Sequence, residues 1–161
     1  MKNVVITGAG RGIGLALTKE FANKGYRVLG TYREERSAGE LLRLAKDSPH
    51  VAAVPADVQD ERTFGPLKEQ VKKLGTVDIL VNNAGVMGDK ARSLLEIDLA
   101  KVAETFNVNT FGPMRVSRAM IPIVVSPGWK PWPSRRHRQT SVPAARAVWP
   151  KAGRIGCGRS R

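Results

Sequence analysis

The chain has 161 residues, 42% of them hydrophobic, and a formal net charge of +13. This length supports one domain with a core, and no apolar run, Ile121–Val125 included, approaches the ~20 apolar residues of a membrane span. The N-terminal apolar run is too short for a signal peptide, and the single cysteine excludes an internal disulfide. We therefore expect a cytoplasmic protein with no membrane partner.

The charge is distributed unevenly along the chain. Residues 1–125 carry 18 Lys/Arg and 14 Asp/Glu, whereas residues 126–161 carry nine Lys/Arg and no acid. All three tryptophans and five of the ten prolines also lie after residue 125. We therefore expect a folded domain over residues 1–125 and an irregular basic tail over residues 126–161.

Strand and helix patterns alternate within the first 125 residues. Short, β-branched apolar runs predict four buried parallel strands, at Lys2–Thr7, Tyr26–Tyr32, Val51–Val54 and Val77–Val81. Apolar residues at helical spacing predict helices at 13–22, Ser37–Lys46, Asp60–Leu74 and Ile97–Ile121. Asp60 is the expected N-cap of the third helix, and Pro113 predicts a kink or break in the fourth. This alternation predicts an α/β fold with a parallel sheet.

A glycine-rich turn joins the first strand to the first helix, with the sequence Thr7-Gly8-Ala9-Gly10-Arg11-Gly12-Ile13-Gly14. A dinucleotide pyrophosphate binds to backbone N–H groups at a helix N-terminus, where side chains would block its approach. The spacing Gly8-x3-Gly12-x-Gly14 differs from the G-x-G-x-x-G of many dehydrogenases, and glycines alone also suit a flexible turn. The position between a buried strand and an amphipathic helix favours the nucleotide site.

Three further motifs follow this turn along the chain. They are Asp57-Val58 after the third strand, Asn82-Asn83-Ala84-Gly85 after the fourth strand, and Asn109 within Phe106–Pro113. Taken singly, an aspartate can cap a helix, asparagines suit turns, and a helical asparagine can lie on an exposed face. Taken in order with the glycine turn, they resemble the short-chain dehydrogenase/reductase family and are similar to its small carbonyl-reductase-like members.

The resemblance covers about residues 1–125 and implies an incomplete, doubly wound, Rossmann-like sheet of about four strands in the order 3-2-1-4. It implies an NAD(P) cofactor, a small carbonyl or alcohol substrate, and homo-oligomers, with no metal site. It assigns Asp57 to the adenine and Asn109 to the catalytic tetrad. The other cofactor-binding residues that it implies are Thr7, Gly8, Arg11, Gly12, Ile13, Gly14, Val58, Asn82, Asn83, Ala84 and Gly85.

The charge at the end of the second strand favours NADP over NAD. NAD-selective sites place an acid there for the ribose 2′-hydroxyl, whereas NADP sites place a cation for the 2′-phosphate. This strand ends in Arg33, with no acid before Glu34, and Arg11 supplies a second cation. Pairing of Arg33 with Glu34 or Glu35 is the alternative, purely structural interpretation.

The resemblance also implies catalytic groups that this sequence does not contain. The family's tetrad includes a serine after a fifth strand and a Tyr-x3-Lys pair, whose tyrosine gives a proton to the carbonyl. No tyrosine follows Tyr32, and the later serines Ser126, Ser134 and Ser141 end no convincing apolar strand. Only Asn109 of the tetrad is carried over, so we expect the chain to be inactive as a reductase.

Residues 126–161 need an explanation of their own. A shifted reading frame is the leading hypothesis, because acid-poor sequence rich in Arg, Pro, Trp, Ser and Gly is typical of GC-rich genes read out of frame. One shifted frame over residues 139–143 can encode Asn-Ile-Ser-Ser-Arg, which resembles the family's fifth-strand end. Nucleic-acid binding is the alternative, but arginines without regular spacing are weak support, and we expect no nucleic-acid partner.

Three functional hypotheses follow. The chain is an NADP-dependent reductase, a residual nucleotide-binding module, or an unstable product whose fourth strand has an unpaired edge.

Overall fold

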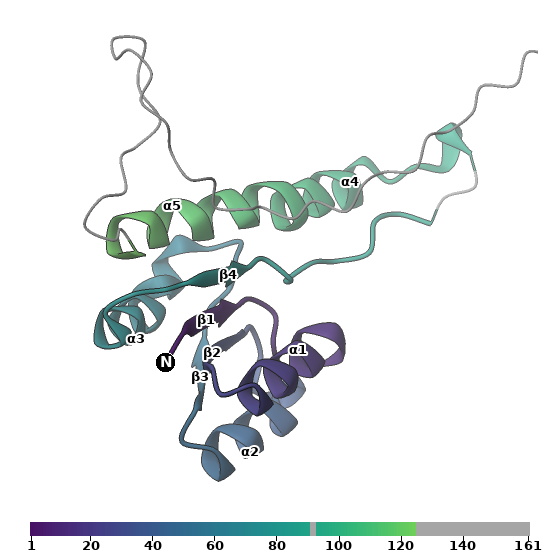
Figure 1. Cartoon of the computed structure of the whole chain (residues 1–161). Helices are drawn as coiled ribbons and strands as arrows, with labels where there is room; N and C mark the ends of the chain where they lie inside the picture. The colour runs from purple at the N-terminus through teal and green to yellow at the C-terminus, as the bar shows by residue number, and fades with distance from the viewer. Residues whose placement is uncertain (91–92, 125–161) are drawn as a thin grey trace, which may run out of the picture. The chain divides into compact units, whose positions relative to one another are not determined.

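The computed structural model describes residues 1–90 and 93–124, so the predictions for residues 126–161 lie outside the described residues. Four strands form one parallel sheet in the order β3-β2-β1-β4, as predicted (Figure 1). They are β1 (Asn3–Ile6), β2 (Arg27–Tyr32), β3 (Val51–Pro55) and β4 (Ile79–Val81). Within the described ranges β4 pairs only with β1, and its three residues are half-buried.

Helices cover both faces of this sheet (Figure 1). The α-helices are α1 (Gly12–Asn23), α2 (Gly39–Asp47), α3 (Gly65–Leu74), α4 (Leu99–Phe106) and α5 (Gly112–Val124). Short 3-10 turns lie at η1 (Glu35–Ser37), η2 (Glu61–Phe64) and η3 (Leu94–Glu96), and a π-helical turn, η4 (Asn107–Phe111), joins α4 to α5. No helix in the described segments is long and apolar enough to cross a bilayer.

Two hydrophobic cores form because successive strand side chains point to opposite faces of the sheet. In β1, Val4 and Ile6 join the core that includes Leu15 of α1 and Leu41 of α2. Val5, between them in sequence, joins the other core, whose members from α3 and α5 are Leu67, Val71, Val116 and Met120. The sheet is thus buried on both sides, as the continuous apolar runs in the sequence predicted.

Three predicted helices begin later than expected, and the one predicted from Ser37 begins at Gly39. Asp60 does accept a hydrogen bond from the Arg62 N–H, at 3.0 Å, but it caps the 3-10 turn η2, and α3 begins only at Gly65. Pro66 lies in the first turn of α3, which suits a residue without an N–H. The helix predicted from Ile97 begins at Leu99, because the Asp98 side chain caps it.

The chain does not break at Pro113, because it remains helical through this residue, and the disturbance predicted there takes the form of the wider turn η4 just before the proline. A proline ring within an α-helix would press on the carbonyl four residues earlier, here that of Asn109. The wider turn η4 precedes Pro113. The N–H of Gly112, the residue that follows η4, donates to the Asn107 carbonyl five residues back. The π-helical turn therefore accommodates the proline without ending the helix.

Candidate dinucleotide-binding site

The glycine turn lies at the carboxyl end of β1 and requires glycine for close approach. Gly8 and Gly12 have φ values of 65° and 54°, in the left-handed region that favours glycine. A Cβ on Gly14 would lie 2.2 Å from the Gly8 carbonyl oxygen, and a Cβ on Gly8 would lie 2.8 Å from the Ala84 Cα. The turn is thus packed against both its own helix and the segment after β4.

The N-terminus of α1 is open to solvent on the outer side of this turn. The N-cap residue, Arg11, is exposed, and its side chain makes no capping hydrogen bond to the helix. Ile13 is 74% exposed, and a Cβ on Gly12 would meet no atom within 4 Å. The first-turn N–H groups of a helix have no intrahelical acceptor, so this end offers donors and space to an anion such as a pyrophosphate.

Thr7 and Asn83 hold the glycine turn to the segment after β4. The buried Thr7 hydroxyl accepts hydrogen bonds from the N–H groups of Asn83 and Ala84, both at 3.0 Å. The Asn83 side-chain amide donates to the carbonyls of Thr7 and Gly8, also at 3.0 Å each. Both side chains were predicted to bind cofactor, and in the structure both are engaged with the backbone that would surround it.

The remaining residues of the predicted asparagine motif lie beside the π-helical turn and α5. Asn82 is exposed, and its amide donates to the hydroxyl of Ser117 on α5 at 3.4 Å. Asn109 exchanges two hydrogen bonds with the backbone of Val86, accepting from its N–H and donating to its carbonyl, both at 2.9 Å. Gly85 lies under this pair, since a Cβ there would be 3.2 Å from the Asn109 Oδ1. Asn109 therefore fixes the path of the chain as it leaves the Asn82–Gly85 segment.

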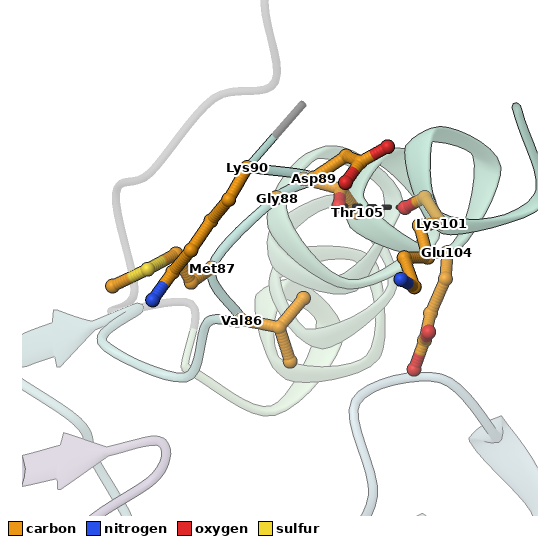
Figure 2. Close-up of a pocket in the computed structure, with 8 residues that line it drawn as sticks. All are labelled: Val86, Met87, Gly88, Asp89, Lys90, Lys101, Glu104 and Thr105. Atoms are coloured by element: carbon orange, nitrogen blue, oxygen red, sulfur yellow. Dashed lines mark hydrogen bonds between the residues drawn. The ribbon is translucent and has the colours of Figure 1, made fainter. Parts of the chain in front are cut away.

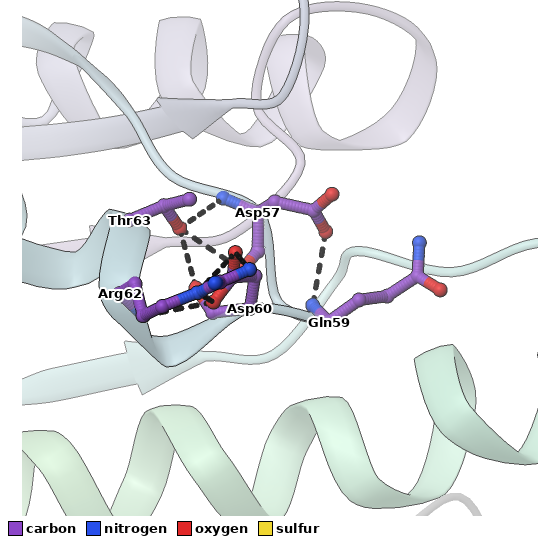
Figure 3. A network of polar contacts seen from close by, with 5 residues as sticks. All are labelled: Asp57, Gln59, Asp60, Arg62 and Thr63. Carbon is purple, nitrogen blue, oxygen red and sulfur yellow. Dashed lines mark hydrogen bonds and ion pairs between the residues drawn. The ribbon is translucent and has the colours of Figure 1, made fainter.

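The loop after β3 is a tight, internally bonded turn (Figure 3). The half-buried Asp57 accepts from the Gln59 N–H at 2.9 Å, and the Asp57 N–H donates to the Thr63 hydroxyl at 2.9 Å. Val58 is buried, whereas Arg62 pairs with Asp60 and lowers the pKa of that carboxyl. One carboxylate oxygen of Asp57 takes part in the turn, and the turn sets where this carboxylate lies.

The cations predicted to select NADP differ in their surroundings. Arg33 pairs with Glu34 at 2.8 Å, and Arg36 pairs with the same carboxylate. These two guanidinium groups, Arg36 first and Arg33 second, hold the pKa of Glu34 below its ordinary value. Arg11 forms no ion pair within the described part of the chain. Arg33 therefore makes the ion pair with Glu34 that the alternative, structural interpretation describes. Arg11, without such a pair in the described ranges, is free to contact an anion.

An open cavity of about 540 Å³ lies between the segment after Gly85 and α4 (Figure 2). Its walls carry side chains of both charges, and the Thr105 hydroxyl donates to the Lys101 carbonyl within it. The lining residues are Val86, Met87, Gly88, Asp89, Lys90, Lys101, Glu104 and Thr105. Because the lining of this cavity carries both charges and the cavity is open to solvent, its chemistry does not favour one class of ligand.

The structure brings most of the predicted residues together at one edge of the sheet. The glycine turn and the Asn82–Gly85 segment are in direct contact, and Asn109 joins them through Val86. Sequence reasoning missed Thr31, whose carbonyl accepts from the Ala9 N–H at 2.7 Å. It also missed Arg115, Asn107 and Gln59, which connect α5 to the Asp57 loop, because no local pattern marks contacts between residues so far apart.

Comparison with known proteins identifies the family. The short chain dehydrogenase profile matches residues 2–129. A 1-deoxy-11-beta-hydroxypentalenate dehydrogenase of Streptomyces arenae is 36% identical over 129 residues, which cover 77% of this chain and 45% of that protein. The chain therefore belongs to the short-chain dehydrogenase/reductase family of NAD(P)-binding oxidoreductases, and it spans less than half the length of this relative.

Solved structures show the same arrangement of strands and helices. NADPH-bound carbonyl reductase from chicken fatty liver superposes with a TM-score of 0.68 at 28% identity, over 76% of this chain and 48% of that one. The 3-ketoacyl-(acyl-carrier-protein) reductase of Brucella melitensis, complexed with NADH, gives 0.66 at 33% identity, over 76% of this chain and 50% of that one. Similar structures thus hold either NADPH or NADH.

Proposed function

We propose that this chain binds NADP(H), as the dinucleotide-binding part of an oxidoreductase that interconverts small carbonyls and alcohols. The observation that carries the proposal is the uncapped, exposed N-terminus of α1 beside a glycine turn held in place by Thr7 and Asn83. When bound, the cofactor supplies the hydride of such a reaction. The chain's own backbone and side chains bind and orient its adenosine and pyrophosphate groups.

Titration of the purified chain with NADPH in a calorimeter tests this proposal. Arg11→Glu places a negative charge at the N-terminus of α1, and we expect it to weaken NADPH binding by about tenfold or more. Lys2→Glu makes the same change of charge before β1, at the opposite end of the strand from the glycine turn, and should leave affinity within about twofold. A chain that binds no NADPH, or equal losses in both variants, would refute the proposal.

The proposed preference for NADP over NAD rests on two cations, Arg11 and Arg33. Arg33 can bind a 2′-phosphate only after its ion pair with Glu34 has broken. The Arg33–Glu34 pair is exposed, and exposed pairs are weak, so a 2′-phosphate can compete for the guanidinium. Parallel titrations with NADPH and NADH test the preference, and tighter binding of NADH would refute it.

We expect a polypeptide of these 161 residues to bind cofactor with little turnover. Its sequence has no Tyr-x3-Lys pair, and positioned proton transfer contributes roughly 10²–10⁴-fold to the rate of such reactions. The measurement is the loss of NADPH absorbance with a panel of small aldehydes and ketones. Robust oxidation of NADPH that depends on the protein would overturn this expectation.

Self-association is proposed from the family resemblance. Large apolar side chains are exposed on η3 and along the α4–α5 helical segment, including Leu95 at 97%, Leu99 at 76% and Met114 at 62%. Such surface is unfavourable in an isolated monomer and supports association. Sedimentation of the purified chain tests this, and a monodisperse monomer at micromolar concentration would contradict it.

A further inference from the structure

Arg115, on α5, connects the π-helical turn to the loop after β3. Its Nη1 donates to the Asn107 carbonyl at 3.1 Å and to the Val58 carbonyl at 3.5 Å, and its Nη2 donates to the Asn107 Oδ1 at 2.7 Å. The Asn107 amide in turn donates to the Gln59 Oε1 at 3.1 Å. The loop that carries Asp57 is thus bound at two successive residues: the Val58 backbone to Arg115 on α5, and the Gln59 side chain to Asn107 of η4.

The surroundings of Arg115 leave little freedom for this arrangement. Its guanidinium lies 5.9 Å from the centre of the Phe111 ring, and within the described ranges it forms no ion pair. Close packing adds to the hydrogen bonds, because a Cβ on Gly112 would lie 2.9 Å from the Val58 Cγ2. A half-buried guanidinium whose donors go to fixed neutral oxygens holds those oxygens in position.

Gln59 links this network to the Asp57 carboxylate. Its N–H donates to the Asp57 Oδ1 at 2.9 Å, while its side chain accepts from Asn107. A displacement of Gln59 would therefore change the position of the carboxylate that the family resemblance assigns to the adenine. Arg115 itself lies on α5 and is linked to that carboxylate through Asn107 and Gln59.

We propose that Arg115 is a positioning residue for the adenine end of the cofactor site, acting through Val58, Asn107 and Gln59 on the Asp57 loop. The proposal rests on the proposed dinucleotide-binding function. It predicts that loss of the guanidinium weakens the binding of any ligand that contains the adenosine half of the cofactor, by the same factor for each.

The test compares Arg115→Leu and Arg115→Lys with Arg118→Gln in the full chain. Arg118 is a matched control, because it lies on the same helix and makes an exposed ion pair with Glu61 beside the same loop. The probes are NADPH and adenosine 2′,5′-bisphosphate, which contains only the adenine end. We expect Arg115→Leu to weaken both by about tenfold, Arg115→Lys to weaken both by less, and Arg118→Gln to stay within about twofold.

Hydrogen exchange without ligand supplies an independent measurement. In Arg115→Leu, the amides of Gln59 and Asp60, which bond to Asp57, should exchange at least about tenfold faster, while those of β3 keep their rates. If the leucine variant does not fold, the lysine variant is measured in the same way, with smaller changes in the same direction.

Several results would overturn the proposal. One is weaker binding of NADPH with unchanged binding of the bisphosphate, and another is unchanged exchange at Gln59 and Asp60. A uniform increase of exchange over the whole domain would show that Arg115 only stabilises the fold. If the wild-type chain binds neither probe, the proposed function fails, and the exchange measurement alone decides whether Arg115 fixes the loop.

Discussion

Asn83→Asp is the most direct perturbation of the candidate site, because it keeps the size of the side chain and removes both of its donors. The amide now donates to the carbonyls of Thr7 and Gly8 at 3.0 Å each. Each bond contributes about 1 kcal/mol, and turning a carboxylate toward two carbonyl oxygens adds about 1–3 kcal/mol. We expect the free energy of unfolding to fall by about 3–5 kcal/mol at pH 7.

The loss should depend on pH in a defined direction. Two facing carbonyl oxygens disfavour the ionised form, so the pKa of the introduced carboxyl is raised in the folded state above its unfolded value of about 3.9. Between these two values the folded state binds more protons than the unfolded state, and stability therefore falls as pH rises. The destabilisation is smallest below the unfolded value of about 3.9 and complete above the raised pKa, where the carboxyl is ionised.

Urea denaturation at pH 4.5 and pH 7 measures this loss. Asn82→Asp is the matched control, because it makes the same substitution one residue earlier, at an exposed side chain whose hydrogen bond to Ser117 is long, at 3.4 Å. It should lose less than about 1 kcal/mol at either pH. A loss below about 1 kcal/mol at pH 7 for Asn83→Asp, or equal losses in the two variants, would refute the role assigned to Asn83.

Three further predictions concern the glycine turn and the cations near it. Gly14→Ala should lower the free energy of unfolding by several kcal/mol, because its Cβ would lie 2.2 Å from the Gly8 carbonyl oxygen. Gly12→Ala has open space around its Cβ and should cost only about 1–2 kcal/mol, which comes from its φ of 54°. Thermal unfolding of both variants tests this order. Glu34→Gln should release Arg33 and tighten NADPH binding about two- to fivefold relative to NADH, and titrations that show no change in the ratio would contradict this. Raising NaCl from 50 to 500 mM should weaken the binding of NADPH more than that of NADH, because the 2′-phosphate adds charge to the contact. Parallel calorimetric titrations at both salt concentrations measure the two losses of affinity. Equal losses would argue against a phosphate-binding cation.

The strands followed from the sequence because the signals that specify them are local, whereas their order was implied by the family resemblance. Apolar runs such as Val51–Val54 lie where the structure has strands, and alternation with helices leaves few parallel topologies. The motifs after β1 and β4 lie at one edge of the sheet because the carboxyl ends of parallel strands share an edge. The contacts between Asn83 or Ala84 and the glycine turn follow from this arrangement.

The partners of the polar side chains could not be predicted in the same way. Nothing in the sequence indicates that Asn83 turns toward Thr7 or that Arg115 reaches Val58, because these contacts depend on how distant elements pack. The π-helical turn before Pro113 was missed for a related reason. The proline predicts a disturbance of the helix, but whether the chain breaks or widens is decided by what α4 and α5 pack against.

The hydrogen bonds between Asn83 and the glycine turn also bear on how the chain folds. They join residues 75 and 76 positions apart, and the pairing of β1 with β4 spans a similar distance. Contacts of such long range form only after a large loop has been closed. During synthesis the glycine turn therefore emerges well before the segment that holds it in place, and its final geometry must wait until residue 84 has left the ribosome and β4 has joined the sheet.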